Sequence, residues 1–581
     1  MFEYKIEKIK FKNSFIFKPK NLVVLIGPNN CGKSQVLKDI LKITTIEKPD
    51  SIVVDDISYS WPSKLSELLD SYNINSIIDN DGNHYIRTLN SSFSGVKNLY
   101  IGNDWEDRVE KWLEKKDEQS RKNFSNYFGN FLVNFLSTED RLKNILQSKS
   151  GEVNKQVENL LQAVYKEGTE IEAKLRELVK DSFELDILLD YTNLVNLCFR
   201  ISKSFGTVPT DPRELRKILE KERRLDEQGD GLKSFISTFL SLHVGQKPVL
   251  LLDEPEAFLH PPQALKLGEI IAEQANNKKQ IFIATHSVDL LRGILNIRQD
   301  IDLIRITRKD DINSISQLNP EEVKKIANDP LLSSTRVLEG LFYKGVVVTE
   351  ADSDSIFYQR LSRQLFDNDD IHYTHSHNKQ TVTKVSMPYF KLKVNHAVIV
   401  DFDILRVWDE LKRLLEQKNA DREIIDKIRE LRKGIVSEVE SQSPKSILTN
   451  LKTEIKDLLD TIKLNVSIDI IESTTVEVRR KLKKIREENS PWSKYKNEGR
   501  RQLSVDNQTK FDEINSYCKA IGVFIVPVGE LESWLVTKGL PKSSSKSKWI
   551  VKALERIPEL SAKKTDIPWS FVSEVHNFLK N

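Results

Sequence analysis

Short runs of consecutive aliphatic residues recur along the chain, and most of them end abruptly in polar or charged side chains. The segments 21–27 (NLVVLIG), 247–253 (KPVLLLD) and 280–287 (QIFIATHS) show this pattern, which is typical of strands buried on both faces of a sheet. Between these runs lie segments with apolar residues at three- and four-residue steps, as in amphipathic helices. The alternation predicts an α/β fold with a largely parallel sheet.

A second series of strands and helices begins at Val346, after the composition changes around residues 328–345. A chain of 581 residues also exceeds the size of one ordinary hydrophobic core. We therefore predict two α/β domains, 1–335 and 340–581. Highly charged stretches with helical periodicity predict a helical insertion in each, at about 105–225 and 405–515. In the second insertion one helix face suggests a helical hairpin or short coiled coil, with Ile424, Ile428, Leu431 and Ile435.

The segment Gly27–Ser34 (GPNNCGKS) fits the pattern GxxxxGK[ST] and stands between a predicted buried strand and a predicted helix. Such a loop turns backbone N–H groups toward phosphate oxygens, and the following helix N-terminus adds a favourable dipole. Lys33 would reach the β- and γ-phosphates, and the Ser34 hydroxyl would ligate Mg²⁺. The sequence therefore predicts ATP binding by the loop residues Gly27, Asn29, Asn30, Gly32, Lys33 and Ser34.

Two further segments place polar side chains at the ends of the neighbouring predicted strands. Asp253 and Glu254 follow one aliphatic run, where Asp253 would hold Mg²⁺ through water and Glu254 would polarise the attacking water. His286 ends the next strand, where a neutral imidazole would contact the γ-phosphate. The alternative for these positions is an ordinary acidic turn and a structural histidine.

Together these residues resemble the ABC-type ATPases, in the branch shared with chromosome-maintenance and recombination-repair proteins. The resemblance implies that the segment 228–233 (QGDGLK), with Gly229 and Gly231, contacts ATP across a dimer, and that residues 256–260 lie at the same contact. The segment departs from the usual Ser-Gly-Gly-Gln pattern. Two glycines at the start of a helix would still expose N–H donors to a phosphate. A homodimer or higher homo-oligomer is implied.

Carboxylates also follow the predicted strands of the second domain. Asp401 and Asp403, like Glu530 and Glu532, are two residues apart, a spacing that puts both side chains on one side of an extended strand end. Hard oxygen ligands of this kind suit Mg²⁺ or Mn²⁺. Two such ions can activate water and stabilise a leaving oxygen, so phosphodiester cleavage is the expected chemistry. The predicted metal ligands of this site are Glu350, Asp354, Asp401, Asp403, Glu530 and Glu532.

This order of acids resembles the Toprim fold of topoisomerases, primases and certain nucleases. An ABC-type ATPase followed by a Toprim-like domain is similar to the overcoming-lysogenization-defect (OLD) family of nucleases, to the Gabija nuclease and to retron-associated effectors. Ala351 stands where that family usually has glycine. The family also uses a lysine beyond the last acid, which implies a catalytic role for Lys546 or Lys548. The bland alternative is a set of acids that cap strands and face solvent.

Charge and composition bear on the partners and the cellular compartment of the protein. The net charge of +3 neither predicts nor excludes a nucleic-acid partner, but residues 479–486 (RRKLKKIR) and 492–501 (WSKYKNEGRR) would suit a DNA backbone. The three cysteines form no CxxC pair, and no signal peptide or membrane-spanning stretch is visible. We therefore expect a cytoplasmic protein without a membrane partner.

The leading functional interpretation is an ATP-regulated, divalent-metal-dependent DNA endonuclease, similar to anti-phage defence effectors. Two alternatives stay open. One is a non-cleaving ABC-type ATPase clamp that binds DNA or a protein. The other is a toxin-like nuclease held inactive by a companion component, such as a reverse transcriptase with its RNA or a helicase.

Overall fold

The computed structural model describes residues 2–45, 50–72, 74–79, 81–89, 96–102, 104–151, 157–245, 247–366, 370–441, 444–462, 473–482, 491–543 and 546–580. The chain divides into two compact units, Met1–Phe342 and Tyr343–Asn581. The sequence interpretation placed this change between residues 335 and 340. No helix of the described residues is long and apolar enough to cross a membrane. The predicted α/β fold is confirmed in both units.

The N-terminal unit is built around a six-stranded sheet of order β16-β15-β3-β14-β13-β8. Its first five strands by sequence pair in parallel, and only β16 runs antiparallel, at one edge. The aliphatic runs seen in the sequence form its centre, where β3, β13 and β14 are buried on both faces. The strands are β3 (Leu22–Ile26), β8 (Val133–Leu136), β13 (Val249–Asp253), β14 (Gln280–Ala284), β15 (Asp302–Lys309) and β16 (Ile312–Gln317).

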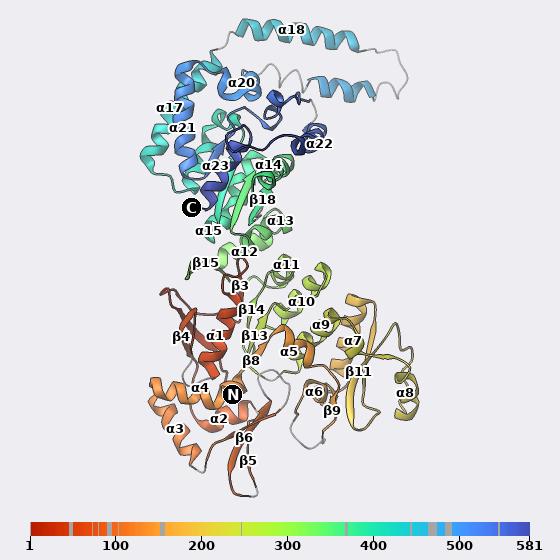
Figure 1. Cartoon of the computed structure of the whole chain (residues 1–581). Helices are drawn as coiled ribbons and strands as arrows, with labels where there is room; N and C mark the ends of the chain where they lie inside the picture. The colour runs from red at the N-terminus through yellow and green to blue at the C-terminus, as the bar shows by residue number, and fades with distance from the viewer. Residues whose placement is uncertain are drawn as a thin grey trace. The chain divides into compact units, whose positions relative to one another are not determined.

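Helices cover both faces of this sheet, with α1 on one side of β13 and β14 and α10 and α11 on the other (Figure 1). Side chains of β3, β13 and β14 form one core with α1, α4 and the sheet β2-β1-β4. These elements are α1 (Lys33–Thr45), α4 (Glu118–Leu132), α10 (Pro261–Gln274), α11 (Val288–Ile297), β1 (Ile6–Phe11), β2 (Ile16–Phe17) and β4 (Val54–Tyr59). A small antiparallel sheet, β5-β6-β7, follows α2. Its bounds and those of the adjoining helices are α2 (Leu65–Ser71), β5 (Asn75–Ile78), β6 (His84–Leu89), β7 (Val96–Tyr100) and α3 (Trp105–Lys115).

The stretch 105–225 was predicted as a helical insertion, but it contains strands as well as helices. Within it, β8 joins the central sheet in parallel with β13, and β9 to β12 form a separate antiparallel sheet. The short β8, with Asn134 in its middle, lacks the aliphatic run that marks the other central strands. The remaining elements of the unit are α5 (Thr138–Lys143), β9 (Ser148–Lys149), α6 (Leu160–Glu167), α7 (Thr169–Phe183), β10 (Asp186–Asp190), β11 (Asn196–Ser202), α8 (Pro212–Leu219), β12 (Arg223–Arg224), α9 (Asp230–His243), α12 (Pro320–Asn328) and α13 (Thr335–Glu339).

The C-terminal unit contains a four-stranded, fully parallel sheet of order β18-β17-β19-β20. One face packs against α14, α22 and α23 through a core that includes Trp534, Trp549 and Trp569. Helix α15 contacts β17 and β19. The elements are β17 (Gly345–Thr349), α14 (Asp352–Leu365), β18 (Ile371–His375), α15 (Val382–Lys391), β19 (Asn395–Val400), β20 (Val523–Ile525), α22 (Lys546–Arg556) and α23 (Trp569–Lys580).

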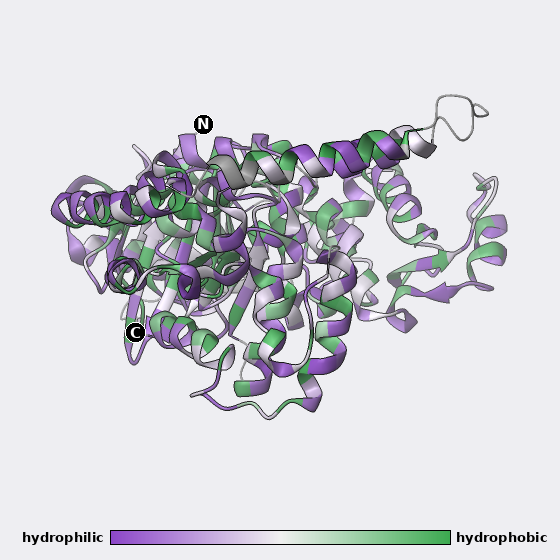
Figure 2. Ribbon diagram, turned by 90° about the horizontal axis from the view of Figure 1, so that it is seen from above, coloured by the Kyte–Doolittle hydropathy of each residue, from purple (hydrophilic) through white to green (hydrophobic). Residues whose placement is uncertain are grey.

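The stretch 405–515, predicted as a second helical insertion, consists of helices joined by short turns where the structure describes it; residues 442–443, 463–472 and 483–490 lie outside the described part. Helix α17 packs against α21 with Ile425, Ile428, Ile435 and Val439 buried, a face shifted from the predicted one. The helices are α16 (Trp408–Gln417), α17 (Arg422–Glu440), α18 (Pro444–Thr461), residues 473–482, α20 (Ser493–Glu498) and α21 (Val505–Ala520). Figure 2 shows that many helices carry both hydrophilic and hydrophobic segments, as amphipathic helices do.

Helices α10 and α11 approach each other closely because each has a glycine at the contact. A Cβ added at Gly268 would lie 2.3 Å from the carbonyl oxygen of Leu290, and one at Gly293 would lie 2.0 Å from that of Leu265. No side chain fits these gaps unless the backbones separate. The two glycines therefore fix how closely this helix pair packs.

We predict that Gly268→Ala destabilises the N-terminal unit by about 1–3 kcal/mol, the usual cost of overpacking. The measurement is the midpoint of thermal unfolding, followed by circular dichroism and limited proteolysis. Gly229→Ala is the matched control, because a Cβ there has no atom within 4 Å and the backbone φ is negative. Equal midpoints for the two variants would contradict the close contact between the helices.

Candidate functional site

The phosphate loop lies between β3 and α1, as its sequence context predicts. Gly27 and Gly32 have positive φ angles of 140° and 99°, and Asn30 has a φ of 59°. A Cβ at Gly27 would lie 2.1 Å from the carbonyl oxygen of Ile306 on β15, so only glycine permits this approach. Lys33 Nζ donates to the carbonyl oxygens of Gly27 and Pro28, both at 2.9 Å. Burial lowers the pKa of Lys33, so this cation lacks full solvation.

Ser34 and Asp253 meet at the carboxyl edge of the parallel sheet. The Ser34 Oγ donates to Asp253 Oδ1 at 2.6 Å, although 219 residues separate them. Burial raises the pKa of Asp253, with a contribution from the neighbouring Glu254 carboxylate. The Ser34 hydroxyl and the Asp253 carboxylate therefore present two adjacent oxygen atoms. Such oxygen donors are the ligands that Mg²⁺ prefers. Together with Lys33 they would hold the cation and the phosphates of ATP.

Glu254 and His286 face each other across β13 and β14. Glu254 has a φ of 48°, in the left-handed region that non-glycine residues rarely adopt. His286 Nε2 lies 3.1 Å from Glu254 Oε1. Burial lowers the pKa of His286 to about 4, with a further decrease from the Lys33 charge. The imidazole is therefore neutral at pH 7 and available as a hydrogen-bond donor beside the glutamate.

Arg141, which the sequence analysis did not identify, holds the backbone beneath this acid pair. Its buried guanidinium donates to the carbonyl oxygens of Asp253 and Glu254, both at 2.7 Å, and to that of Leu136 at 3.0 Å. Its Nε donates to Ser234 Oγ on α9 at 3.0 Å. Arg141 thus connects the ends of β8 and β13 to α9. A lone arginine in a charged stretch carries no sequence signal for such a role.

The segment 228–233 begins helix α9, with Gly229 at the N-cap. A Cβ at Gly231 would lie 2.6 Å from the carbonyl oxygen of Phe258, so the helix start packs on the loop after Glu254. No hydrogen bond or ion pair in the described part of the chain joins this segment to the phosphate loop. Its predicted contact with ATP across a dimer stays a prediction.

Glu256 begins the loop 256–260, whose predicted place at the dimer contact stays a prediction. Its Oε1 accepts hydrogen bonds from Thr285 Oγ1 at 2.6 Å and from His286 N at 2.9 Å. Burial raises the pKa of Glu256. The residue fixes the backbone at His286, whereas Phe258 in the same loop is 57% exposed.

A second group of polar side chains lies at the carboxyl edge of the sheet in the C-terminal unit. Glu350 follows β17 directly, Asp401 follows β19, and Glu530 and Glu532 follow β20. Asp354 lies in the first turn of α14. Because these three strands are parallel, they end at the same edge, and the structure brings the acids together there. We call Glu350, Asp354, Asp401, Asp403, Glu530 and Glu532 the acidic cluster.

Two acids of the cluster, Glu350 and Asp401, have no cation of the described residues within ion-pair distance. Glu350 Oε1 accepts a hydrogen bond from Asp401 N at 2.9 Å, and neither carboxylate forms an ion pair with any described residue. Burial raises the pKa of Glu350 to about 7, with the charges of Asp403 and Asp354 adding to it. Burial and the Glu350 charge raise the pKa of Asp401 well above its usual range. This centre favours a proton or an added cation.

Lysines surround the outer acids of the cluster. Lys546 Nζ lies 3.1 Å from Asp354 Oδ1, and Lys379 Nζ lies 3.4 Å from Asp403 Oδ2. Glu530 pairs with Lys542 at 3.4 Å and with Lys496 at 3.8 Å. Burial lowers the pKa of Lys546, but the charges of Asp354, Asp401 and Glu532 outweigh that effect and raise it overall. Of the two candidate lysines, Lys546 is the one whose contact with the cluster is defined, through Asp354.

The local geometry of the acid pairs differs from the extended strand ends that the two-residue spacing suggested. Asp403 lies in a 3₁₀ helix, Phe402–Arg406, and Glu532 in another, Leu531–Ser533. Within the described residues no three His, Cys, Asp or Glu side chains are arranged to hold a metal ion. The oxygen donors suit Mg²⁺ in kind, and ligation by the acidic cluster stays a prediction. Lys496 belongs to the basic segment 492–501 noted in the sequence, whereas Lys379 and Lys542 had no sequence signal for contact with these acids.

Comparisons with known proteins bear on the N-terminal unit. The family model described as "AAA domain, putative AbiEii toxin, Type IV TA system" matches residues 22–292, just under half of the chain. The glucosylceramide transporter ABCA12 of Mus musculus is 34% identical over 77 residues, 13% of this chain and 3% of the transporter, and the Homo sapiens protein gives the same values. The chain therefore spans only 3% of the length of these curated relatives.

Two solved structures are similar at low scores. The SMC head domain from Thermotoga maritima is 13% identical with a TM-score of 0.29, covering 54% of this chain and 99% of that one. The Smc head domain derived from Pyrococcus furiosus is 13% identical with a TM-score of 0.33, covering 56% and 98%. The assignment rests on the family model and on the phosphate-loop geometry instead. Residues 22–292 match the model of this AAA domain and carry the phosphate loop in a mixed α/β fold, which supports an ATPase.

We predict that Glu254→Gln lowers ATP hydrolysis by about 10²–10⁴-fold, because the amide cannot act as a general base. The substitution keeps the size of the side chain and a hydrogen-bonding group beside His286, so binding of a fluorescent ATP analogue should stay within about threefold of wild type. Lys33→Ala should abolish that binding. Hydrolysis that persists in Glu254→Gln would contradict the assignment of Glu254.

Proposed function

We propose that the chain is an ATP-regulated, divalent-metal-dependent DNA endonuclease whose cutting site is the acidic cluster. The single observation that carries the proposal is that Glu350 and Asp401 meet at one sheet edge, where Glu350 Oε1 accepts a hydrogen bond from Asp401 N, and that neither carboxylate forms an ion pair with a described residue. Acids that merely cap strands and face solvent would not be buried against one another. An uncompensated pair of this kind is costly unless cations or protons join it.

The residues of the cluster suit phosphodiester hydrolysis. Glu350, Asp401 and Asp403 would hold Mg²⁺ or Mn²⁺, and bound cations would supply activation of water and stabilisation of the leaving oxygen. Lys546, kept charged by the surrounding acids, would contact the scissile phosphate. Lys379 and Lys496 would attract the flanking phosphates, as cations near a nucleic-acid backbone do. The parallel four-stranded sheet with acids after its strands supports a Toprim-like domain.

The N-terminal unit would supply the regulation. Lys33, Ser34 and Asp253 would bind Mg²⁺-ATP, and Glu254, oriented through the Arg141 contacts to its backbone, would direct the attacking water. The glycines that begin α9 would face the nucleotide of a second copy, so the active form would be a homodimer or a higher homo-oligomer. Nucleotide state would then control access of DNA to the acidic cluster.

A second candidate is a toxin-like effector held in check by a companion protein or RNA, such as a reverse transcriptase with its RNA or a helicase. The description of the matching family, which names a putative toxin, favours it. The two candidates share the cutting site and differ in control. Growth arrest on expression that disappears with Glu350→Gln, and that a neighbouring gene suppresses, would favour the toxin-like form.

We predict that Glu350→Gln and Asp401→Asn each abolish metal-dependent nicking of supercoiled plasmid DNA, with a loss of at least about 100-fold, because each removes a charged ligand. ATP hydrolysis should stay within about twofold of wild type. Asp426→Asn, an exposed acid on α17, is the matched control and should cut normally. Equal nicking by wild type and Glu350→Gln, or no nicking by wild type with any divalent metal, would refute the proposal.

We predict that Lys546→Met lowers nicking by at least about tenfold, since it removes the only cation paired with Asp354 among the described residues. Lys548→Met makes the same chemical change two residues away and should cut within about twofold of wild type. The comparison is made with both proteins at matched concentration and with circular dichroism spectra that agree. The opposite ranking would assign the role to Lys548.

A further inference from the structure

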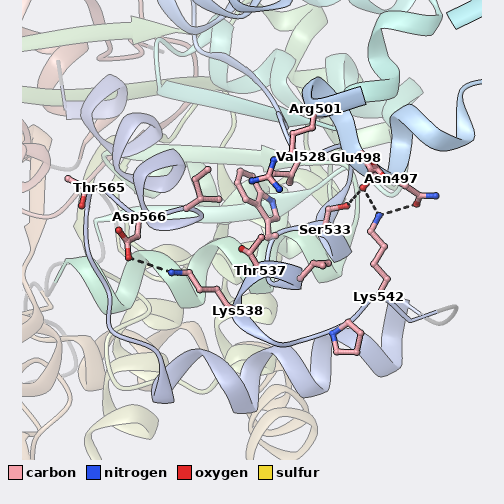
Figure 3. Close-up of a pocket in the computed structure, with 14 residues that line it drawn as sticks. Asn497, Glu498, Arg501, Val528, Ser533, Thr537, Lys538, Lys542, Thr565 and Asp566 are labelled. Carbon is pink, nitrogen blue, oxygen red and sulfur yellow. Dashed lines mark hydrogen bonds and ion pairs between the residues drawn. The ribbon is translucent and has the colours of Figure 1, made fainter. Parts of the chain in front are cut away.

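A pocket of about 800 Å³ lies in the C-terminal unit beside the acidic cluster, within the size range of small-molecule sites. Its walls come from four segments: the end of α20 with the turn after it, the 3₁₀ turns that follow β20, residues 541–542 and residues 565–567 (Figure 3). These segments place cationic, hydroxyl and apolar groups around one space. The proposed function does not yet account for it.

The pocket and the acidic cluster share a backbone loop. Gly499 and Gly529, with φ angles of 57° and 104°, bring the turn after α20 against the loop after β20, where a Cβ at Gly499 would lie 2.3 Å from the carbonyl oxygen of Pro527. The same loop continues into Glu530, and its Gly529 carbonyl accepts a hydrogen bond from Phe402 N, next to Asp401, at 2.9 Å. These backbone contacts therefore place the pocket beside the acidic cluster.

The charges of the pocket favour an anionic ligand with polar edges. Arg501 extends into the space (Figure 3) and forms no hydrogen bond or ion pair with any described residue. Its neighbour Arg500 donates to both carboxylate oxygens of Asp512 at 2.6 Å, which fixes the turn that presents Arg501. Lys538 pairs only loosely with Asp566, at 3.5 Å. Glu498 adds a carboxylate that forms no ion pair with the described residues and can accept a hydrogen bond from a ring or amino N–H.

Apolar groups form the rest of the wall. Val536 and Ile567 are 46% and 43% exposed, unusual for aliphatic side chains, and Pro541 and Val528 lie beside them. The Trp534 indole closes the floor and is itself fixed by a hydrogen bond from its Nε1 to Tyr358 Oη at 2.9 Å. A flat, partly apolar ligand fits such walls, with its charged group at Arg501.

We infer that this pocket binds one nucleotide of the nucleic-acid strand next to the scissile phosphate, with the base against Val536 and Ile567 and the phosphate at Arg501 and Lys538. The inference rests on the proposed function, because the strand must run on from the acidic cluster. Lys542 marks the junction: it lines the pocket and pairs with Glu530 of the cluster. A phosphate at one site and the adjoining nucleotide at the other then belong to one continuous strand.

The test measures binding without cutting, in full-length Glu350→Gln protein, by fluorescence anisotropy of a labelled single-stranded DNA of mixed sequence. Adding Arg501→Gln should weaken binding about tenfold and reduce the slope of log affinity against log salt by about one phosphate contact. Arg360→Gln is the matched control: this exposed arginine lies toward the end of α14, which runs away from the carboxyl edge of the sheet, and binding should change less than twofold.

Two further probes address the base and the source of the nucleotide. Thr537 is an exposed residue of the pocket wall, and Thr537→Trp would fill the pocket with a large side chain. This variant should no longer bind an intact strand more tightly than a strand with abasic sites. Free dAMP should compete only weakly with the strand. Equal binding by Arg501→Gln and Arg360→Gln overturns the inference, as does dAMP that displaces the strand at equimolar concentration. Loss of binding in Arg501→Gln with a wild-type protein that never nicks would refute the nuclease proposal and leave the pocket assignment standing.

Discussion

Parallel strand pairing is the constraint on which both candidate sites depend. In each unit the chain returns to the same sheet edge after every crossover, so the residues that follow each strand gather there regardless of their separation in sequence. Ser34 and Asp253 meet in this way across 219 residues, and Glu350 and Asp401 meet across 51. An antiparallel arrangement would have sent successive strand ends to opposite edges.

The two edges balance their buried charge differently. In the N-terminal unit the buried Arg141 binds the backbone carbonyls of Asp253 and Glu254 and leaves their side chains turned toward Ser34 and His286. In the C-terminal unit lysines pair with Asp354, Asp403 and Glu530, while Glu350 and Asp401 form no ion pair with a described residue. Burial raises the pKa of a carboxyl group that has no cation beside it. Such a group favours the binding of an additional positive charge.

Close backbone contacts at glycine determine how these edges connect to their surroundings. Gly27 lets the phosphate loop touch β15, and Gly499 and Gly529 let the turn after α20 lie against the loop that carries Glu530. The second contact joins the pocket around Arg501 to the acidic cluster. Substrate chemistry and strand positioning can therefore share one rigid loop instead of two independent ones.

The sequence by itself determined the α/β class, the central strands and the phosphate loop, because consecutive aliphatic residues and the GxxxxGKS spacing are local patterns. It also singled out Glu350 and Asp401, since each follows a recognisable strand, and the family resemblance left Lys546 and Lys548 as alternatives. It did not reveal β8, Arg141 or the contacts of Lys379 and Lys542 with the acids. Those depend on partners distant in sequence: a short strand with Asn134 at its centre pairs only because β13 lies beside it. Burial, which sets the charge state of Glu350, likewise exists only once the sheet has formed.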